Sequence, residues 1–64
     1  MVKVNGAPLD IAGKTLGEYL SGTGYDTTRI AVELNGEIVF KSLYAETVLQ
    51  DGNSLEVVSF VGGG

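Results

Sequence analysis

The residues best suited to chemistry in this 64-residue sequence are the last three, Gly62, Gly63 and Gly64. Glycines have no side chain to pack, and ordering their backbone costs more conformational entropy than ordering any other residue. Fully extended, the three reach about 10 Å, at roughly 3.3–3.6 Å per residue. We therefore expect a flexible stalk over 62–64 that presents the Gly64 carboxylate to an enzyme with a narrow channel. A cloning remnant or a frayed end would contain the same three residues.

The rest of the sequence offers few groups for catalysis. It contains no cysteine and no histidine, which removes the thiolate nucleophile and the commonest general base and metal ligand at neutral pH. The acid pairs Glu18 with Glu46 and Asp10 with Asp26 are better explained as solvated surface groups. The segment 22–24 lacks the lysine and the spacing of a phosphate-binding loop. We predict no catalytic residue, no metal site and no bound cofactor, so the protein should not be an enzyme.

The charge of the chain limits its partners. Eight acidic residues against four basic ones give a net charge of −4. This charge argues against nucleic acid, for which a basic stripe would be expected. It suits a partner with a basic docking surface, although mild acidity can also serve solubility alone. No apolar run is long enough to cross a bilayer, and the first residues lack a signal pattern. We expect a cytoplasmic protein with no membrane partner.

The N-terminal segment predicts a hairpin. Apolar and polar residues alternate over 1–5, as in a half-buried strand. Asn5-Gly6 follows, and both residues tolerate the positive φ of a type I′ turn. The returning strand should extend to Ile11. Because Pro8 has no amide hydrogen to donate, this strand should lie at an edge of the sheet.

A short helix should follow the hairpin. Thr15 and Glu18 have the spacing of a capping box, in which each side chain accepts a hydrogen bond from the other residue's amide. Three apolar residues then share one helical face: Leu16, Tyr19 and Leu20. Gly22 and Gly24 should end the helix. So short a helix must be held by packing against a sheet.

The second half of the sequence predicts strands separated by short turns. In chain order we expect a loop over 24–28, a strand over 29–35, a turn at Asn35-Gly36, a strand over 37–40, an irregular segment over 41–46, a brief pairing over 47–49, a turn over 50–53 and the longest strand over 54–61. In the irregular segment, either Leu43 or Tyr44 should point into the core. The last strand is the most apolar, so we expect it at the centre of the sheet.

This order of elements predicts an α+β fold, with one main helix packed across one face of a mixed sheet of four to five strands. The first strand is the expected parallel neighbour of the last, joined to it by the right-handed crossover that such pairs require. This topology is the ubiquitin-like β-grasp. The domain should comprise residues 1–61, followed by the stalk over 62–64.

The last strand also predicts a surface for a partner. Leu55 and Val57 should face the core, which leaves Val58 and Phe60 exposed on the other side. Exposed apolar residues next to the stalk, together with Val61, are typical of a partner-binding patch. In the alternative arrangement, Phe60 folds inward around a bulge and belongs to the core.

The whole chain resembles one known family, the ThiS sulfur carriers of thiamine biosynthesis. The resemblance rests on Val4-Asn5-Gly6, the helix start over 15–20, Leu34-Asn35-Gly36-Glu37-Ile38-Val39, the segment 48–58 and Phe60-Val61-Gly62-Gly63-Gly64. Phe40 departs from it, because the family often has proline there.

The resemblance implies a reaction at Gly64. An E1-like adenylyltransferase of the ThiF type would adenylate its carboxylate with Mg-ATP, and a persulfide sulfur donor would displace AMP to leave a thiocarboxylate. That sulfur would pass to a thiazole synthase of the ThiG type. Two alternatives share the fold and the tail: the small subunit of molybdopterin synthase, and a ubiquitin-like modifier conjugated to lysines. A plain interaction module with a frayed end is a third.

Overall fold

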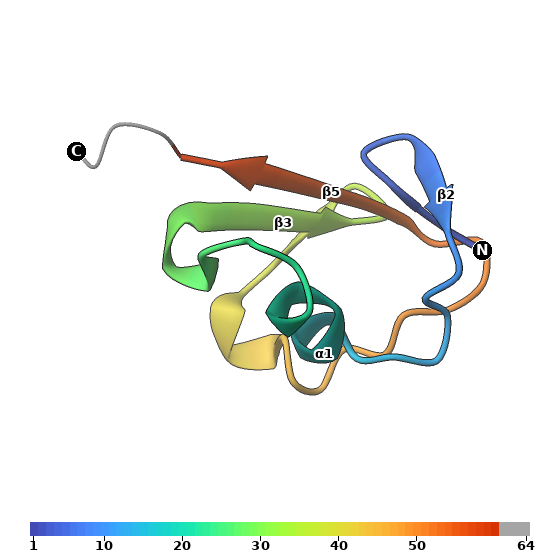
Figure 1. Ribbon diagram of the computed structural model, residues 1–64, viewed down its shortest axis with the longest axis horizontal. Helices are drawn as coiled ribbons and strands as arrows, with labels where there is room; N and C mark the ends of the chain where they lie inside the picture. The colour runs from blue at the N-terminus through green and yellow to red at the C-terminus, as the bar shows by residue number, and fades with distance from the viewer. Residues whose placement is uncertain (61–64) are drawn as a thin grey trace.

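A computed structural model describes residues 1–60 and contains a mixed five-stranded sheet with one helix packed on it (Figure 1). The elements in chain order are β1 (Val2–Val4), β2 (Ala7–Leu9), α1 (Leu16–Ser21), the 3-10 helix η1 (Thr27–Arg29), β3 (Ile30–Leu34), β4 (Glu37–Val39), the 3-10 helix η2 (Lys41–Leu43) and β5 (Ser54–Ser59). The strand order is β2-β1-β5-β3-β4. The predicted α+β fold is confirmed.

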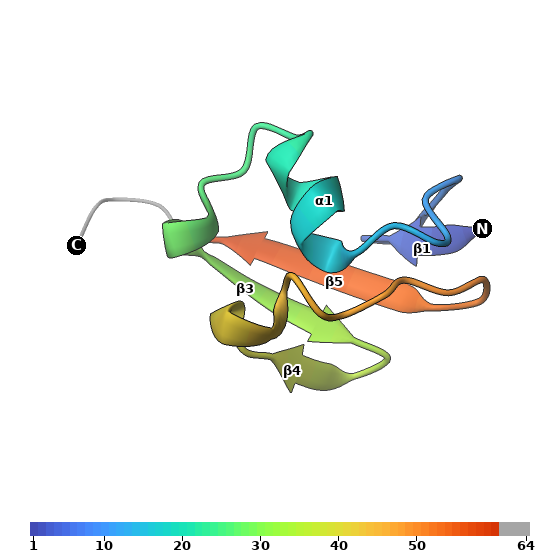
Figure 2. The ribbon, with the colours of Figure 1, turned by 90° about the horizontal axis from the view of Figure 1, so that it is seen from below.

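The C-terminal strand β5 lies at the centre of this sheet. It runs parallel to β1, with Lys3 opposite Ser54, and antiparallel to β3 along the whole of β3. The helix α1 lies across one face of the sheet, which we call the inner face (Figure 2). The predicted position of the last strand and its parallel pairing with the first are therefore confirmed.

Two Asn-Gly turns connect β1 to β2 and β3 to β4. Asn5 has φ 50° and Gly6 φ 86°, and Asn35 has φ 51° and Gly36 φ 86°, as the predicted type I′ geometry requires. Both asparagine side chains also bind β5. The Val57 amide donates to Asn5 Oδ1 at 2.8 Å, while Asn5 Nδ2 donates to the Val57 carbonyl at 3.2 Å. The Ser54 amide donates to Asn35 Oδ1 at 2.9 Å.

The start of the helix follows the sequence prediction. The Glu18 amide donates to Thr15 Oγ1 at 3.1 Å, and the Thr15 amide donates to Glu18 Oε1 at 2.8 Å. Hydrogen bonds to the Glu18 carboxylate from the Thr15 amide and the Thr15 side chain, with Lys14 nearby, lower the pKa of Glu18 below its ordinary value. The helix ends at Gly22, which keeps a right-handed conformation. Leu16 and Leu20 are completely buried, and Tyr19 packs against the core.

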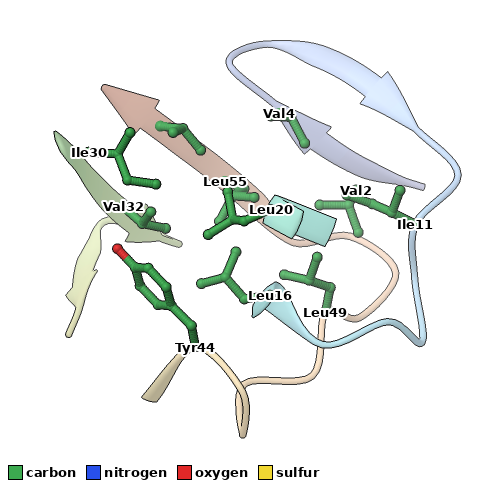
Figure 3. Close-up of a cluster of buried hydrophobic side chains, with 11 residues drawn as sticks. Val2, Val4, Ile11, Leu16, Leu20, Ile30, Val32, Tyr44, Leu49 and Leu55 are labelled. Carbon is green, nitrogen blue, oxygen red and sulfur yellow. The ribbon is translucent and has the colours of Figure 1, made fainter. Parts of the chain in front are cut away.

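Two local predictions were wrong. The strand expected to extend to Ile11 ends at Leu9, because Ile11 turns under the sheet into the core next to Val2 (Figure 3). Pro8 does lie on an edge strand, as expected. The segment expected as a loop contains η1, whose first turn is capped by Asp26: the Thr28 amide donates to Asp26 Oδ1 at 3.0 Å.

The core lies between α1 and the inner face of the sheet (Figure 3). Its buried members are Val2, Val4, Ile11, Leu16, Leu20, Ile30, Val32, Tyr44, Leu49, Leu55 and Val57. Of the two candidates in the irregular segment, Tyr44 is buried and Leu43 is exposed. Val48 forms a bridge with Thr15, which confirms the brief pairing predicted over 47–49. This bridge ties the segment 47–49 to the start of the helix.

Candidate functional site

The candidate site lies at the end of β5, the strand that leads into the predicted stalk. Ladder pairing with β3 continues one residue beyond the strand, because the Phe60 amide donates to the Arg29 carbonyl at 2.7 Å. Val61, Gly62, Gly63 and Gly64 lie outside the described residues. The stalk and its boundary with the domain therefore stay predictions, while the base from which they emerge is held by β3.

The side chains of β5 alternate between the two faces as predicted. Leu55 and Val57 are buried on the inner face, whereas Val58 and Phe60 are 55% and 60% exposed. The alternative in which Phe60 folds inward around a bulge is wrong, since the register with β3 is regular from Ser59 to Leu55. The predicted exposure of Val58 and Phe60 is confirmed; their role in binding a partner stays a prediction.

Strand β4 and the residue that follows it contribute two exposed apolar side chains that the sequence prediction had not assigned to the site. Ile38 and Phe40 are 66% and 70% exposed. Val39 pairs with the buried Val32, so Ile38 points away from the core. Phe40 follows two residues later with extended backbone and continues on the same side. The signal for this pair was the alternation of Ile38 and Phe40 with Val39.

We call the face of the sheet opposite α1 the outer face. Its apolar patch, the outer patch, consists of Ile38, Phe40, Val58 and Phe60. The small side chain of Ala31, which pairs with Val58, lies between the β4 and β5 members. In Figure 1 the helix lies below β3 and β5, and within residues 1–60 no helix is drawn above these two strands. A large exposed apolar patch on a monomer is typical of a surface that binds another molecule.

Two acidic residues lie next to the outer patch. Glu33 of β3 and Glu56 of β5 are directly opposite each other in the ladder. Ile38 pairs with Glu33 on its other side. The ion pairs found within residues 1–60 join the Met1 amino group to Asp51 and Arg29 to Asp26, so neither includes this acidic pair. The outer face therefore combines apolar side chains with two carboxylates that form no ion pair among residues 1–60.

Three further side chains in the described part of the chain have shifted pKa values. Hydrogen bonds from the Thr28 hydroxyl and amide lower the pKa of Asp26, while burial raises the pKa of Tyr19 and Tyr44. Each of these shifts moves the group away from titration near pH 7. Among residues 1–60, no three acidic, histidine or cysteine side chains gather into a possible metal site. No helix in this part of the chain has the length and apolar character to span a membrane.

Known proteins resemble this chain along its whole length. The model of the ThiS family matches residues 2–64. The sulfur carrier protein ThiS of Thermus thermophilus is 39% identical over 64 residues, which cover 100% of both chains. The crystal structure of the thiamine biosynthesis protein ThiS from Geobacter metallireducens superposes with a TM-score of 0.79 at 33% identity, covering 98% of this chain and 97% of the other.

Two longer proteins also contain a related segment. A thiazole synthase of Paramagnetospirillum magneticum is 47% identical over 53 residues, which are 83% of this chain and 16% of that protein. A thiazole synthase of Magnetococcus marinus is 41% identical over 64 residues, or 20% of its length. The chain thus spans only a fifth or less of these two relatives.

Proposed function

The chain belongs to the ThiS family, and from this premise we propose that it is a sulfur carrier of thiamine biosynthesis that carries the sulfur on the C-terminal carboxyl group of Gly64. The observation that carries the proposal is the family match over residues 2–64, which includes the terminal glycines together with the β-grasp domain. The full-length similarity to the sulfur carrier ThiS of Thermus thermophilus supports it.

The proposed reaction uses partner enzymes for every chemical step. An E1-like adenylyltransferase of the ThiF type binds Mg-ATP, and a carboxylate oxygen of Gly64 attacks the α-phosphorus as pyrophosphate leaves. The resulting mixed anhydride activates the carbonyl carbon. The terminal sulfur of a persulfide attacks this carbon and AMP leaves; a thiol then cleaves the remaining S–S bond. The product is a thiocarboxylate on Gly64.

The chain's own residues would contribute recognition. Hydrogen bonding between Phe60 and Arg29 keeps the end of β5 in the ladder up to the last described residue. The partner would bind Val58 and Phe60 of the outer patch together with Val61. Glycines over 62–64 would let the backbone pass close to the walls of a narrow active-site channel.

A thiazole synthase of the ThiG type is the proposed acceptor of the sulfur. Two thiazole synthases contain a segment related to this chain. A carrier domain joined to the enzyme that consumes its sulfur would explain that arrangement, because covalent linkage raises the effective concentration of the carrier. The same matches favour thiamine biosynthesis over the molybdopterin synthase alternative and over conjugation to lysines.

The test is the intact mass of the chain after incubation with Mg-ATP, a ThiF-type adenylyltransferase and a persulfide donor. We expect a mass gain equal to one exchange of oxygen for sulfur, localised to Gly64 by fragmentation. A chain truncated after Gly62 is the control and should gain nothing. An unchanged mass, with an enzyme that is active on its own carrier, would contradict the proposal. An isopeptide bond to lysine would indicate a conjugated modifier instead.

A further inference from the structure

The acidic pair on the outer face occupies an unusual position. Glu33 and Glu56 face each other across the two central antiparallel strands of the sheet. Like charges directly opposite in such a pair destabilise a sheet. No basic side chain among residues 1–60 forms an ion pair with either carboxylate. Within the described part of the chain, the two carboxylates therefore have no ion-pair partner.

The nearest basic residues of the sheet lie towards its two ends. Lys3 pairs in register with Ser54, two residues before Glu56. Arg29 lies at the opposite end of β3, where its Nε is 3.7 Å from an Asp26 carboxylate oxygen.

The acidic pair Glu33 and Glu56 is contiguous with the outer patch, because Ile38 pairs with Glu33 and Val58 follows Glu56 by two residues on the same face. One partner surface could cover both.

The two negative charges restrict the chemistry of a partner surface that could bind here. A purely apolar partner would have to remove water from both carboxylates without replacing their hydrogen bonds, which is unfavourable. A second copy of this chain, bound through the same face, would bring its own Glu33 and Glu56 towards the first pair. The net charge of −4 adds to that repulsion. A partner surface with a basic side chain surrounded by apolar ones would pair with the two carboxylates and also cover the outer patch.

We propose that Glu33 and Glu56 together bind an arginine or lysine side chain of the adenylating enzyme, which covers the outer patch at the same time. The inference rests on the proposed function, because it takes the partner to be the enzyme that receives the stalk leaving β5. The two carboxylates lie on the strand that leads to the stalk and on its neighbour. An ion pair there would add affinity for the adenylating enzyme next to the end of β5.

The test compares two double variants of equal net charge. Glu33→Gln/Glu56→Gln removes the pair while keeping the side-chain shapes. Asp10→Asn/Glu46→Gln removes the same number of charges from exposed sites outside β3 and β5. Binding to the ThiF-type adenylyltransferase is measured by titration calorimetry at two salt concentrations. The rate of Gly64 adenylation at saturating carrier is measured alongside.

We expect the first variant to bind about 10- to 100-fold more weakly than the original chain. Its affinity should also depend less on salt, because a charge-assisted contact is lost. Its melting temperature should stay the same or rise by a few degrees, since the cross-strand repulsion is removed. The adenylation rate at saturation should persist, because Gly64 is untouched. The second variant should bind like the original chain.

Two results would contradict the inference about Glu33 and Glu56 while leaving the proposed function intact. The first is an unchanged affinity and salt dependence in Glu33→Gln/Glu56→Gln. The second is an equal loss of affinity in both double variants, which would assign the effect to net charge. If the original chain is neither bound nor adenylated by an enzyme active on its own carrier, the proposed function fails as well. The two failures are therefore distinguishable.

Discussion

Replacing Asn5 by glycine tests how the central strand is held beyond the end of β1. The parallel ladder between β1 and β5 pairs Lys3 with Ser54 and Val4 with Leu55. After that, the chain turns away at Asn5-Gly6, and the Asn5 side chain takes over as the partner of Val57. It accepts from the Val57 amide at 2.8 Å and donates to the Val57 carbonyl at 3.2 Å. The Asn5 side chain thus makes the two hydrogen bonds to Val57 that the backbone of one further β1 residue would have made.

The structure supplies a matched control at Asn35. Asn5 and Asn35 have φ angles of 50° and 51°, and each precedes a glycine at 86°. Asn35 makes a single side-chain hydrogen bond to β5, as acceptor from the Ser54 amide. Glycine adopts this positive φ without strain, and its extra entropy in the unfolded chain is similar at both sites. The difference between Asn5→Gly and Asn35→Gly therefore isolates the side-chain hydrogen bonds.

The expected difference follows from these contacts. Asn5→Gly loses two hydrogen bonds to a buried residue, at about 1 kcal/mol each. Asn35→Gly loses one, and the exposed Ser54 amide can bond to water, so we expect about 0.5 kcal/mol. The difference of about 1.5 kcal/mol is large for a domain of this length, whose total stability should be roughly 3–10 kcal/mol. It corresponds to a fall in melting temperature of about 6–12 °C.

Urea unfolding followed by far-ultraviolet circular dichroism measures this difference, because the chain has no tryptophan to report by fluorescence. Each free energy of unfolding comes from the midpoint and slope of the transition. Equal losses in Asn5→Gly and Asn35→Gly would refute the reasoning and show that Val57 does not depend on the Asn5 side chain. A larger loss in Asn35→Gly would refute it as well.

Two further predictions concern the outer patch and the helix start. Phe60→Ser should leave the fold intact while raising the dissociation constant for the adenylating enzyme. Phe60 is 60% exposed, which is about 120 Å² of a roughly 200 Å² side chain. Burying this area in the complex contributes at most about 3 kcal/mol to the binding free energy, so we expect the dissociation constant to rise about 10- to 100-fold. Leu43→Ser, on the exposed η2, is the binding control, and equal affinities for both variants would contradict the assignment. Glu18→Gln should make the melting temperature less sensitive to acid as the pH falls through and below 4.5, the ordinary pKa of this carboxyl group. The folded-state pKa of Glu18 lies below its ordinary value, so its contribution is present at higher pH and is lost as the pH falls through that lowered pKa. An unchanged pH profile in Glu18→Gln would contradict this prediction.

Local features of the structure were predictable because their causes lie within a few residues. Asn5-Gly6 and Asn35-Gly36 form their turns because both residues of each pair tolerate positive φ. The Thr15–Glu18 capping box depends only on a spacing of three residues. Alternation placed Leu55 and Val57 on the inner face and Val58 and Phe60 on the outer face. In each case the chemistry of neighbouring residues left one good conformation.

Other features of the structure depended on which distant segments of the chain pack against each other. The returning strand ends at Leu9, and Ile11 is buried next to Val2 in the core cluster that α1 completes with Leu16 and Leu20. Leu43 and Tyr44 are adjacent and both apolar, so the choice of Tyr44 for the core was made by the position of the irregular segment under β3 and not by its sequence.

Sequence alone determined the fold class, the central place of β5 beside β1 and the candidate chemistry at Gly64, because periodicity, turn chemistry and family motifs are all written along the chain. Only the tertiary structure brought Ile38 and Phe40 onto the same face as Val58 and Phe60, and set Glu33 opposite Glu56. These residues are about twenty positions apart in the sequence. Their meeting depends on the register between β3, β4 and β5, which is decided by the packing of all three strands on a single core.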